Sequence, residues 1–333
     1  PGSKGADARM HHGCAAVGRS AHRAAALSLS AIAMIDASNY SSWRRRPNTT
    51  MGMSPSAARG NATAPRLPYL YGTAWKKEAT VELVVQAVRA GFRGIDTACQ
   101  PKHYREDLVG EALAQLAREG GPQRDELWLQ TKFTPLGGQD SRNVPYDPRA
   151  PLRTQVEQSI AKSLQNLRTN RIDSLVLHSP LSLEQTLQVW AVFERAVDHG
   201  IVGQLGISNC YDPRFFQSLY QAARVKPAVL QNRFYVDSGY DVQLRAFCLE
   251  KGIAYQTFWT LTANPHILRA TPVRRAAERL RATEQQVLFR WLIQSGHQPL
   301  TGTKSWEHML QDLSVTSFDL TPAEMAEIGA LFR

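Results

Sequence analysis

Short apolar runs alternate with helical patterns along residues 66–333, and this alternation constrains the fold more than any other feature of the sequence. Extended runs are predicted at residues 67–73, 92–95, 127–131, 172–177, 202–207, 228–230, 253–257 and 299–300. Helical patterns are predicted at residues 80–90, from 106 onward, and at 154–167, 183–199, 213–223, 242–250, 273–280, 284–294, 306–313 and 322–331. Strands joined through helices pair in parallel with right-handed crossovers, so the pattern indicates an α/β protein. Eight such units over about 265 residues are typical of a closed (β/α)8 TIM barrel.

A doubly wound open sheet is the alternative fold for this alternation. Such a sheet more often carries a glycine fingerprint after its first strand, where a nucleotide phosphate binds. The sequence contains neither GxGxxG nor GxxxxGK. We therefore expect the barrel, formed by residues 66–333.

Residues 1–65 differ in composition from the rest and are expected to form an irregular, disordered N-terminal extension. The segment is rich in Ala, Ser, Arg and Gly, and it contains a WRRRP cluster at residues 43–47. It could be an organelle transit segment, a tether that orders on a protein partner, or untranslated sequence ahead of a start at Met51 or Met53. The first reading places the barrel in an organelle and the third places it in the cytoplasm.

The charge distribution argues against nucleic-acid binding. Residues 1–66 hold nine Lys/Arg and two acids, a balance of +7, whereas the remainder holds 30 basic and 27 acidic residues, a balance of +3. A nucleic-acid-binding domain concentrates basic residues on one face. The near balance of the barrel therefore predicts no such partner.

Membrane and metal signals are also missing from the sequence. The longest apolar run, residues 24–35, is interrupted by serines and too short to span a bilayer. Four scattered cysteines form neither a CxxC motif nor a Cys/His cluster. We expect no membrane span, no structural metal and a reducing compartment.

Polar or aromatic residues stand where the predicted strands end. In chain order they are Asp96, Lys132, His178, Ser208 with Asn209, Gln231, Phe258, and residues 301–305, and Tyr104 lies in the loop after the second strand. Each of these residues alone has an ordinary structural explanation, such as capping a helix or, for the lysine, extending a charged side chain into solvent. In a barrel the carboxyl ends of all strands converge on one mouth, where active sites form. Their recurrence on successive strands favours a common site.

An acid, a lysine, a tyrosine and a histidine at one mouth could build a proton donor. A free tyrosine has a pKa near 10, and a nearby ammonium is expected to lower it by stabilising the phenolate. A buried aspartate would keep the lysine charged, and a neutral histidine would orient a carbonyl oxygen. Asn and Gln suit a primary amide such as nicotinamide, on whose ring an aromatic side chain can stack.

With these motifs in place, residues 66–333 resemble the aldo-keto reductase superfamily. The matching motifs are LPYLYGTAW, GFRGIDTA, LWLQTKF, LVLHSP, GISNC, AVLQNRF, GIAYQTFW and TGTKSWEHMLQDL, in that order. The resemblance implies a catalytic tetrad of Asp96, Tyr104, Lys132 and His178. It implies nicotinamide contacts from Ser208, Asn209 and Gln231, with Phe258 under the ring. Further cofactor contacts are implied at Thr260, Leu261, Thr303, Lys304, His308 and Asp312.

Three departures from the family pattern bear on the site. Tyr104 lies eight residues after Asp96, a few more than usual, which indicates a small insertion. Residues 137–151 form an inserted loop that could cover the site or dock a partner. Gly302 and Thr303 stand where many members have Lys and Ser, and His308 stands where many have Arg. Lys304 and His308 could still hold a 2′-phosphate, so NADP(H) is expected while NAD(H) is not excluded.

Two functions are consistent with the sequence. The first is an NADPH-dependent oxidoreductase that reduces aldehyde or ketone carbonyls of small molecules, with a tyrosine proton donor. The alternative is a non-catalytic subunit of the same fold, anchored by the extension within a larger assembly, which could be organellar. The presence of all four tetrad residue types favours the enzyme.

Overall fold

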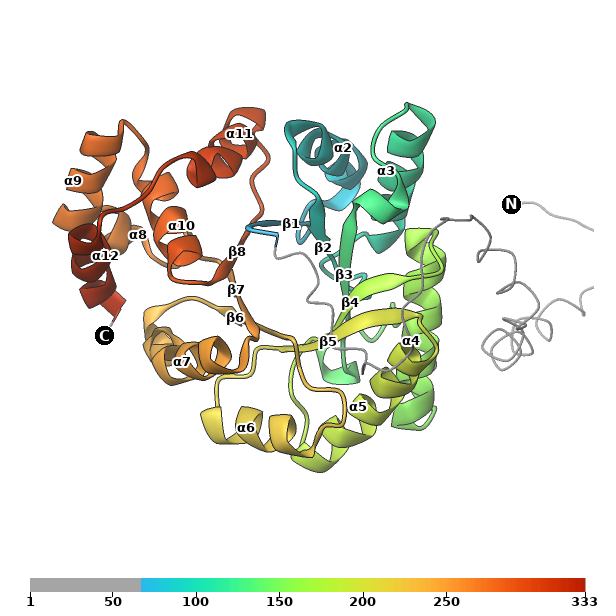
Figure 1. Cartoon of the computed structure of the whole chain (residues 1–333). Coiled ribbons are helices and arrows are strands. Elements are labelled where there is room, and N and C mark those ends of the chain that lie inside the picture. The colour runs from blue at the N-terminus through green and yellow to red at the C-terminus, as the bar shows by residue number, and fades with distance from the viewer. Residues whose placement is uncertain (1–66, 333) are drawn as a thin grey trace, which may run out of the picture. The chain divides into compact units, whose positions relative to one another are not determined.

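The computed structural model describes residues 67–332, and the expectations for residues 1–65 lie outside this range. Within it, eight parallel strands close into a barrel in sequence order, β1 through β8 (Figure 1). The strands are β1 Leu70–Gly72, β2 Gly94–Asp96, β3 Trp128–Phe133, β4 Ile172–Leu177, β5 Val202–Ser208, β6 Val229–Arg233, β7 Ala254–Phe258 and β8 Gln298–Thr301. The barrel predicted from the alternation is confirmed.

Helices surround the barrel on its outer side (Figure 1). They are α2 Thr80–Ala90, α3 Glu106–Arg118, α4 Leu152–Leu167, α5 Leu183–Asp198, α6 Pro213–Ala222, α7 Val242–Lys251, α8 Pro265–Leu268, α9 Thr271–Leu280, α10 Glu284–Gln294, α11 Trp306–Ser314 and α12 Pro322–Gly329. Short 3-10 turns lie at Lys77–Ala79, Arg124–Glu126, Leu136–Gly138, Val236–Asp241, Val315–Ser317 and Ala330–Phe332. In this part of the chain no helix is both long and apolar enough to cross a bilayer.

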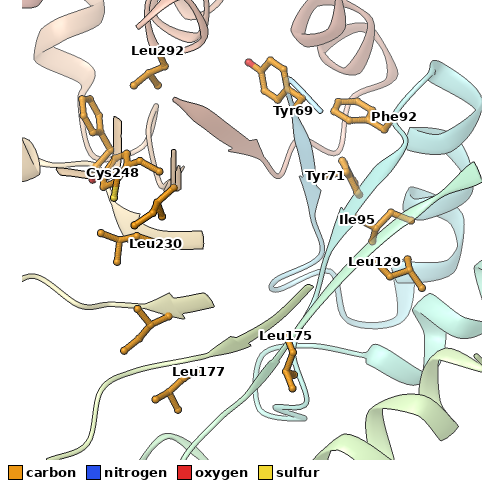
Figure 2. Packing of buried hydrophobic residues seen from close by; sticks show 14 of the residues in the cluster. Tyr69, Tyr71, Phe92, Ile95, Leu129, Leu175, Leu177, Leu230, Cys248 and Leu292 are labelled. Carbon is orange, nitrogen blue, oxygen red and sulfur yellow. The ribbon is translucent and has the colours of Figure 1, made fainter. Parts of the chain in front are cut away.

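The hydrophobic core lies between the barrel wall and the helices. Successive residues of a strand face opposite sides, and the buried apolar residues Ile95, Leu129 and Leu175 belong to one cluster with residues of the outer helices. Figure 2 shows these side chains together with Leu230 of β6, Cys248 of α7 and Leu292 of α10. Apolar side chains at alternate strand positions therefore pack against the helices and hold them on the barrel.

Buried amides form a hydrogen-bonded chain across the barrel interior. Gln130 of β3 exchanges hydrogen bonds with Gln256 of β7, at 2.7 and 3.1 Å. Gln256 also donates to Gln298 of β8 at 2.8 Å, and Gln298 donates to the carbonyl of Leu67 at 2.5 Å. Buried amides need such partners because an unpaired one is costly. The chain of amides runs from β3 across to the first residue of β8 and the segment before β1.

The loop after β2 is held by the start of α3. Glu106 is buried and accepts hydrogen bonds from Thr131 at 2.5 Å and from Asn166 at 3.0 Å. Helix α3 lies very close to the end of α4, since a Cβ on Gly110 would stand 2.0 Å from the carbonyl oxygen of Asn166. These contacts fix the chain just after Tyr104.

The structure differs from the predicted elements mainly at their ends. Strand β3 extends to Phe133, so Lys132 lies within the strand, and α4 begins at residue 152. The single turn of α8 was not predicted, because four residues are too few to show a helical period. The inserted loop 137–151 packs beside the barrel mouth, where Tyr146 is buried and donates to the carbonyl of Thr134 at 2.9 Å.

Candidate active site

The carboxyl ends of the strands surround a cavity of about 930 Å³. Twelve of the fourteen residues predicted for the site line it: Asp96, Tyr104, His178, Ser208, Asn209, Gln231, Phe258, Thr260, Leu261, Thr303, His308 and Asp312. Lys132 lies in the wall behind Asp96, and Lys304 lies outside the lining on the exposed segment after β8. The structure therefore gathers the predicted residues at one end of the barrel, as the strand-end pattern required.

Asp96 and Lys132 form a fully buried ion pair at the base of the cavity. Their Oδ2 and Nζ atoms are 2.6 Å apart, with 3% and 0% of the side chains exposed. Lys132 also donates to the carbonyl of Thr97 at 2.8 Å. Asp96 Oδ1 accepts from Gln130 at 2.8 Å and from Gln231 at 3.0 Å. Burial lowers the pKa of Lys132, and the Asp96 carboxylate opposes that shift.

The inserted residues after β2 still bring Tyr104 to the pair. The loop folds back through backbone bonds from His103 and Tyr104 to the carbonyl of Gln100, both 3.0 Å long. Lys132 Nζ lies 5.3 Å from the centre of the Tyr104 ring, and the His178 ring lies 5.9 Å from it. The three predicted catalytic side chains thus contact one another around the cavity.

The expected lowering of the Tyr104 pKa by Lys132 stays a prediction, because other groups in this structure shift the pKa upward. Burial raises the pKa of Tyr104, and the Asp96 carboxylate raises it further. The ammonium of Lys132 is itself paired with Asp96 at 2.6 Å. The site therefore holds Tyr104 as a neutral phenol, a hydrogen-bond donor rather than a ready acid.

His178 is neutral, as predicted. Burial lowers its pKa well below the usual value, and the charges of Lys132 and His103 lower it further. Its Nδ1 lies 2.6 Å from the hydroxyl of Thr134, and the ring lines the cavity. Among the described residues Nε2 has no hydrogen-bond partner, so it is available to a ligand.

The amides predicted to bind nicotinamide are already anchored on their protein side. Asn209 has a left-handed backbone, with φ of 53°, and its amide nitrogen donates to the carbonyl of His178 at 2.9 Å. The Gln231 nitrogen donates to Asp96 and Gln256, at 3.0 and 2.9 Å. This leaves the Gln231 oxygen for a donor such as a carboxamide. Ser208 and half-buried Phe258 complete this side of the cavity.

The segment after β8 provides cations and a helix start for an anionic ligand. Ser305 caps α11 by accepting from the backbone N–H of His308 at 3.3 Å, and a helix N-terminus favours negative charge. Buried Lys76, beyond β1, donates to the carbonyl of Gly302. Burial and the neighbouring charge of Lys304 lower the pKa of Lys76 to about 8.

Three further predicted contacts are held by local bonds. Thr260 is buried and donates to Thr257 at 2.9 Å, and Leu261 packs against the core. Asp312 accepts from Thr301 at 2.6 Å, and burial raises its pKa to about 6. A carboxyl group suits a hydroxyl or amine donor of a ligand and not a phosphate.

Several cavity residues were not predicted from the sequence. Trp75 and His103 stack with ring centres 3.8 Å apart at the mouth. Thr134 orients His178, and Arg233 lines the cavity at the end of β6. Lys76 and Arg233 stand at or just after strand ends, so the rule used for Lys132 and His178 could have found both.

No metal centre is evident in residues 67–332, where no three His, Cys, Asp or Glu side chains gather closely enough to hold an ion. Cys99, Cys210 and Cys248 are buried and free.

The site suits an oxidoreductase that protonates a carbonyl oxygen beside an anionic nucleotide. Residues 68–333 match the model of the Aldo/keto reductase family, and the chain belongs to that family. It is thus an NAD(P)H-dependent reductase of carbonyl compounds, which favours the first functional hypothesis over the non-catalytic subunit.

Two curated relatives are similar over most of their length. The NADPH-dependent D-xylose reductase of Meyerozyma guilliermondii is 25% identical over 300 residues, covering 77% of this chain and 88% of the relative. The NAD/NADP-dependent indole-3-acetaldehyde reductase of Schizosaccharomyces pombe is 29% identical over 290 residues, covering 81% and 93%. The crystal structure of MGS-M4, an aldo-keto reductase from a Medee basin deep-sea metagenome library, shares the fold, with a TM-score of 0.69, 21% identity and coverage of 83% and 94%.

Proposed function

We propose that this protein reduces aldehyde or ketone groups of small molecules with NADPH, and that Tyr104 donates the proton. The observation that carries the proposal is the meeting of Tyr104, the Asp96–Lys132 pair and neutral His178 at one cavity. A proton donor, its charged support and a neutral orienting group are what carbonyl reduction requires.

The cavity fits a nicotinamide dinucleotide. Lys76 is a buried cation without an acidic partner among the described residues, which suits a phosphate group. The free oxygen of Gln231 and the ring of Phe258 suit the carboxamide and the face of nicotinamide. Lys304 and His308 would favour the additional phosphate of NADPH. When bound, the reduced cofactor would supply a hydride to the carbonyl carbon.

The chain itself moves the proton. The neutral phenol of Tyr104 donates a hydrogen bond to the carbonyl oxygen, which becomes an alkoxide-like base as the carbon is reduced. Proton transfer is then favourable despite the raised pKa of Tyr104, because an alkoxide is more basic than a phenolate. Lys132 lies 5.3 Å from the ring centre and stabilises the phenolate left behind.

His178 orients the substrate. If the Thr134 hydroxyl donates to Nδ1, the proton of the ring is on Nε2, which then donates to the same carbonyl oxygen. A neutral imidazole suits this task because it leaves the proton transfer to Tyr104.

The test is Tyr104→Phe, assayed by NADPH oxidation with a reactive aldehyde, and in parallel with NADH. We expect kcat to fall by roughly a hundredfold or more, as for loss of a general acid, while NADPH binding followed by fluorescence is retained. Tyr220→Phe is the matched control, because Tyr220 of α6 lies outside the cavity lining and packs on Phe247. Activity that survives in Tyr104→Phe would exclude Tyr104 as the proton donor.

A further inference from the structure

Arg233 is a cation on the cavity wall that no acidic group neutralises. It is the last residue of β6 and pairs in register with Phe258, the residue proposed to lie under the nicotinamide. No ion pair and no side-chain hydrogen bond involves its guanidinium among residues 67–332, and its Nε is buried without an acceptor. A buried donor without a partner is rare enough to need an explanation.

The nearest acids along the chain are engaged elsewhere or make no contact. Asp241 is buried and accepts from Asn232 at 2.7 Å and from Tyr255 at 2.8 Å. Asp237 is exposed and forms no ion pair with Arg233. At the cavity base Asp96 is neutralised by Lys132. The charge of Arg233 is therefore available to a ligand.

Aromatic rings hold the guanidinium in place without using its hydrogen bonds. The guanidinium carbon, Cζ of Arg233, lies 4.3 Å from the centre of the Trp259 ring and 5.1 Å from the centre of the Tyr235 ring. Such contacts engage the face of a guanidinium, whereas its N–H donors point outward in the plane. Trp259 has a left-handed backbone, with φ of 57° and half of its surface exposed. This conformation is unfavourable for a bulky residue, yet it brings the indole to the arginine.

From this geometry we propose that Arg233 binds the carboxylate of an acidic carbonyl substrate, an inference that rests on the proposed reductase activity. A carboxylate approaching the guanidinium edge accepts two parallel N–H bonds. Tyr104 lines the same cavity, so the carbonyl end of such a substrate would lie toward it. The preferred substrate class is therefore aldehydes or ketones that carry a carboxylate.

The experiment compares benzaldehyde with para-carboxybenzaldehyde at saturating NADPH, using the full chain. We expect wild type to favour the carboxylated aldehyde in kcat/KM by roughly ten- to hundredfold, the range for charge-assisted hydrogen bonds. Arg233→Met should lose most of this preference, mainly through KM. Arg233→Lys keeps the charge but not the planar fork of N–H donors, so this variant should retain only part of the preference for the carboxylated aldehyde.

Arg214→Met is the matched control, because this substitution removes the same charge from an exposed residue of α6 that lies outside the cavity lining. The ratio of kcat/KM for the carboxylated aldehyde to that for benzaldehyde should be the same in Arg214→Met and in wild type. A wild-type ratio near 1 would overturn the proposal, and so would a ratio that Arg233→Met leaves unchanged. So would an equal loss on both aldehydes together with weaker NADPH binding, because Arg233 would then hold the cofactor.

Binding of benzoate, measured by calorimetry in the presence of NADP⁺, separates this proposal from the reductase activity. If benzoate binds the wild type and not Arg233→Met, the carboxylate site is supported even where neither aldehyde is reduced. Absence of reduction would refute the proposed function and leave the carboxylate site standing. Absence of benzoate binding to wild type would refute the carboxylate site.

Discussion

Replacing Lys132 by Met tests whether the buried ion pair carries charge. The change removes an ammonium that lies 2.6 Å from Asp96 and has no exposed surface. It leaves the carboxylate buried with two amide donors, Gln130 and Gln231, at 2.8 and 3.0 Å. It also leaves the carbonyl of Thr97 without the bond it accepts from Lys132 at 2.8 Å.

The size of the effect follows from this geometry. At an effective dielectric constant near 20, opposite charges at this separation attract by about 6 kcal/mol before desolvation is counted. Breaking a buried pair by removing one partner costs about 3–5 kcal/mol in proteins. Because the two amides continue to stabilise the carboxylate, we expect the free energy of unfolding to fall by about 3 kcal/mol, the lower end of that range.

Urea unfolding followed by circular dichroism measures the loss, and the double variant Asp96→Asn/Lys132→Met provides the control. Removing the second charge should restore more than half of the lost stability, while NADPH-dependent reduction remains absent in both variants. A single variant that unfolds within about 1 kcal/mol of wild type would refute the reasoning, because a neutral or solvated Asp96 would then need no counterion.

Two further predictions concern the barrel interior. Gln130→Leu removes a donor from Asp96 and leaves the buried amide of Gln256 without its partner across the barrel, so urea unfolding should show a loss of about 2–3 kcal/mol and lower kcat. Burial and the charge of Arg245 lower the pKa of His297 to about 3. An unfolded histidine titrates near 6.5, so between that pH and 3 the unfolded chain binds a proton that the folded chain does not. Stability should therefore fall as pH falls, by up to about 1.4 kcal/mol per pH unit from this group, and His297→Asn should reduce that slope in urea titrations at several pH values.

The barrel and most of the site could be predicted because both depend on local pattern. Alternating apolar runs and helical periods fixed the order of strands, and that order places all strand ends at one mouth. Even Tyr104, after a longer loop, reaches Lys132, because the loop needs only enough chain to fold back. For such residues, the position along a strand is enough to predict that they lie at the mouth of the barrel.

Properties that depend on partners from distant segments could not be predicted. The raised pKa of Tyr104 results from burial and from Asp96 acting together, while Lys132 is neutralised by the same carboxylate. Gln130 and Gln256 are 126 residues apart, and neither sequence position indicates that they face each other inside the barrel. The identity of a residue gives its chemistry, but its ionisation depends on which groups the fold places beside it.

The local charge of the cavity also explains why the overall charge balance was a poor guide to ligands. Residues 67–333 are nearly neutral in sum, yet the cavity wall and its margin hold Arg233 and Lys76 without acidic partners. Buried Lys76 in particular would cost less free energy if it were paired with an acid or replaced by an apolar residue, since a desolvated cation without a counterion is costly. Such a cost persists where a ligand supplies the missing charge. The two cations lie on different parts of the wall, beside β6 and beside the segment after β8. An anionic cofactor can satisfy the second, and the first then requires a negative group of its own, which the substrate is left to provide.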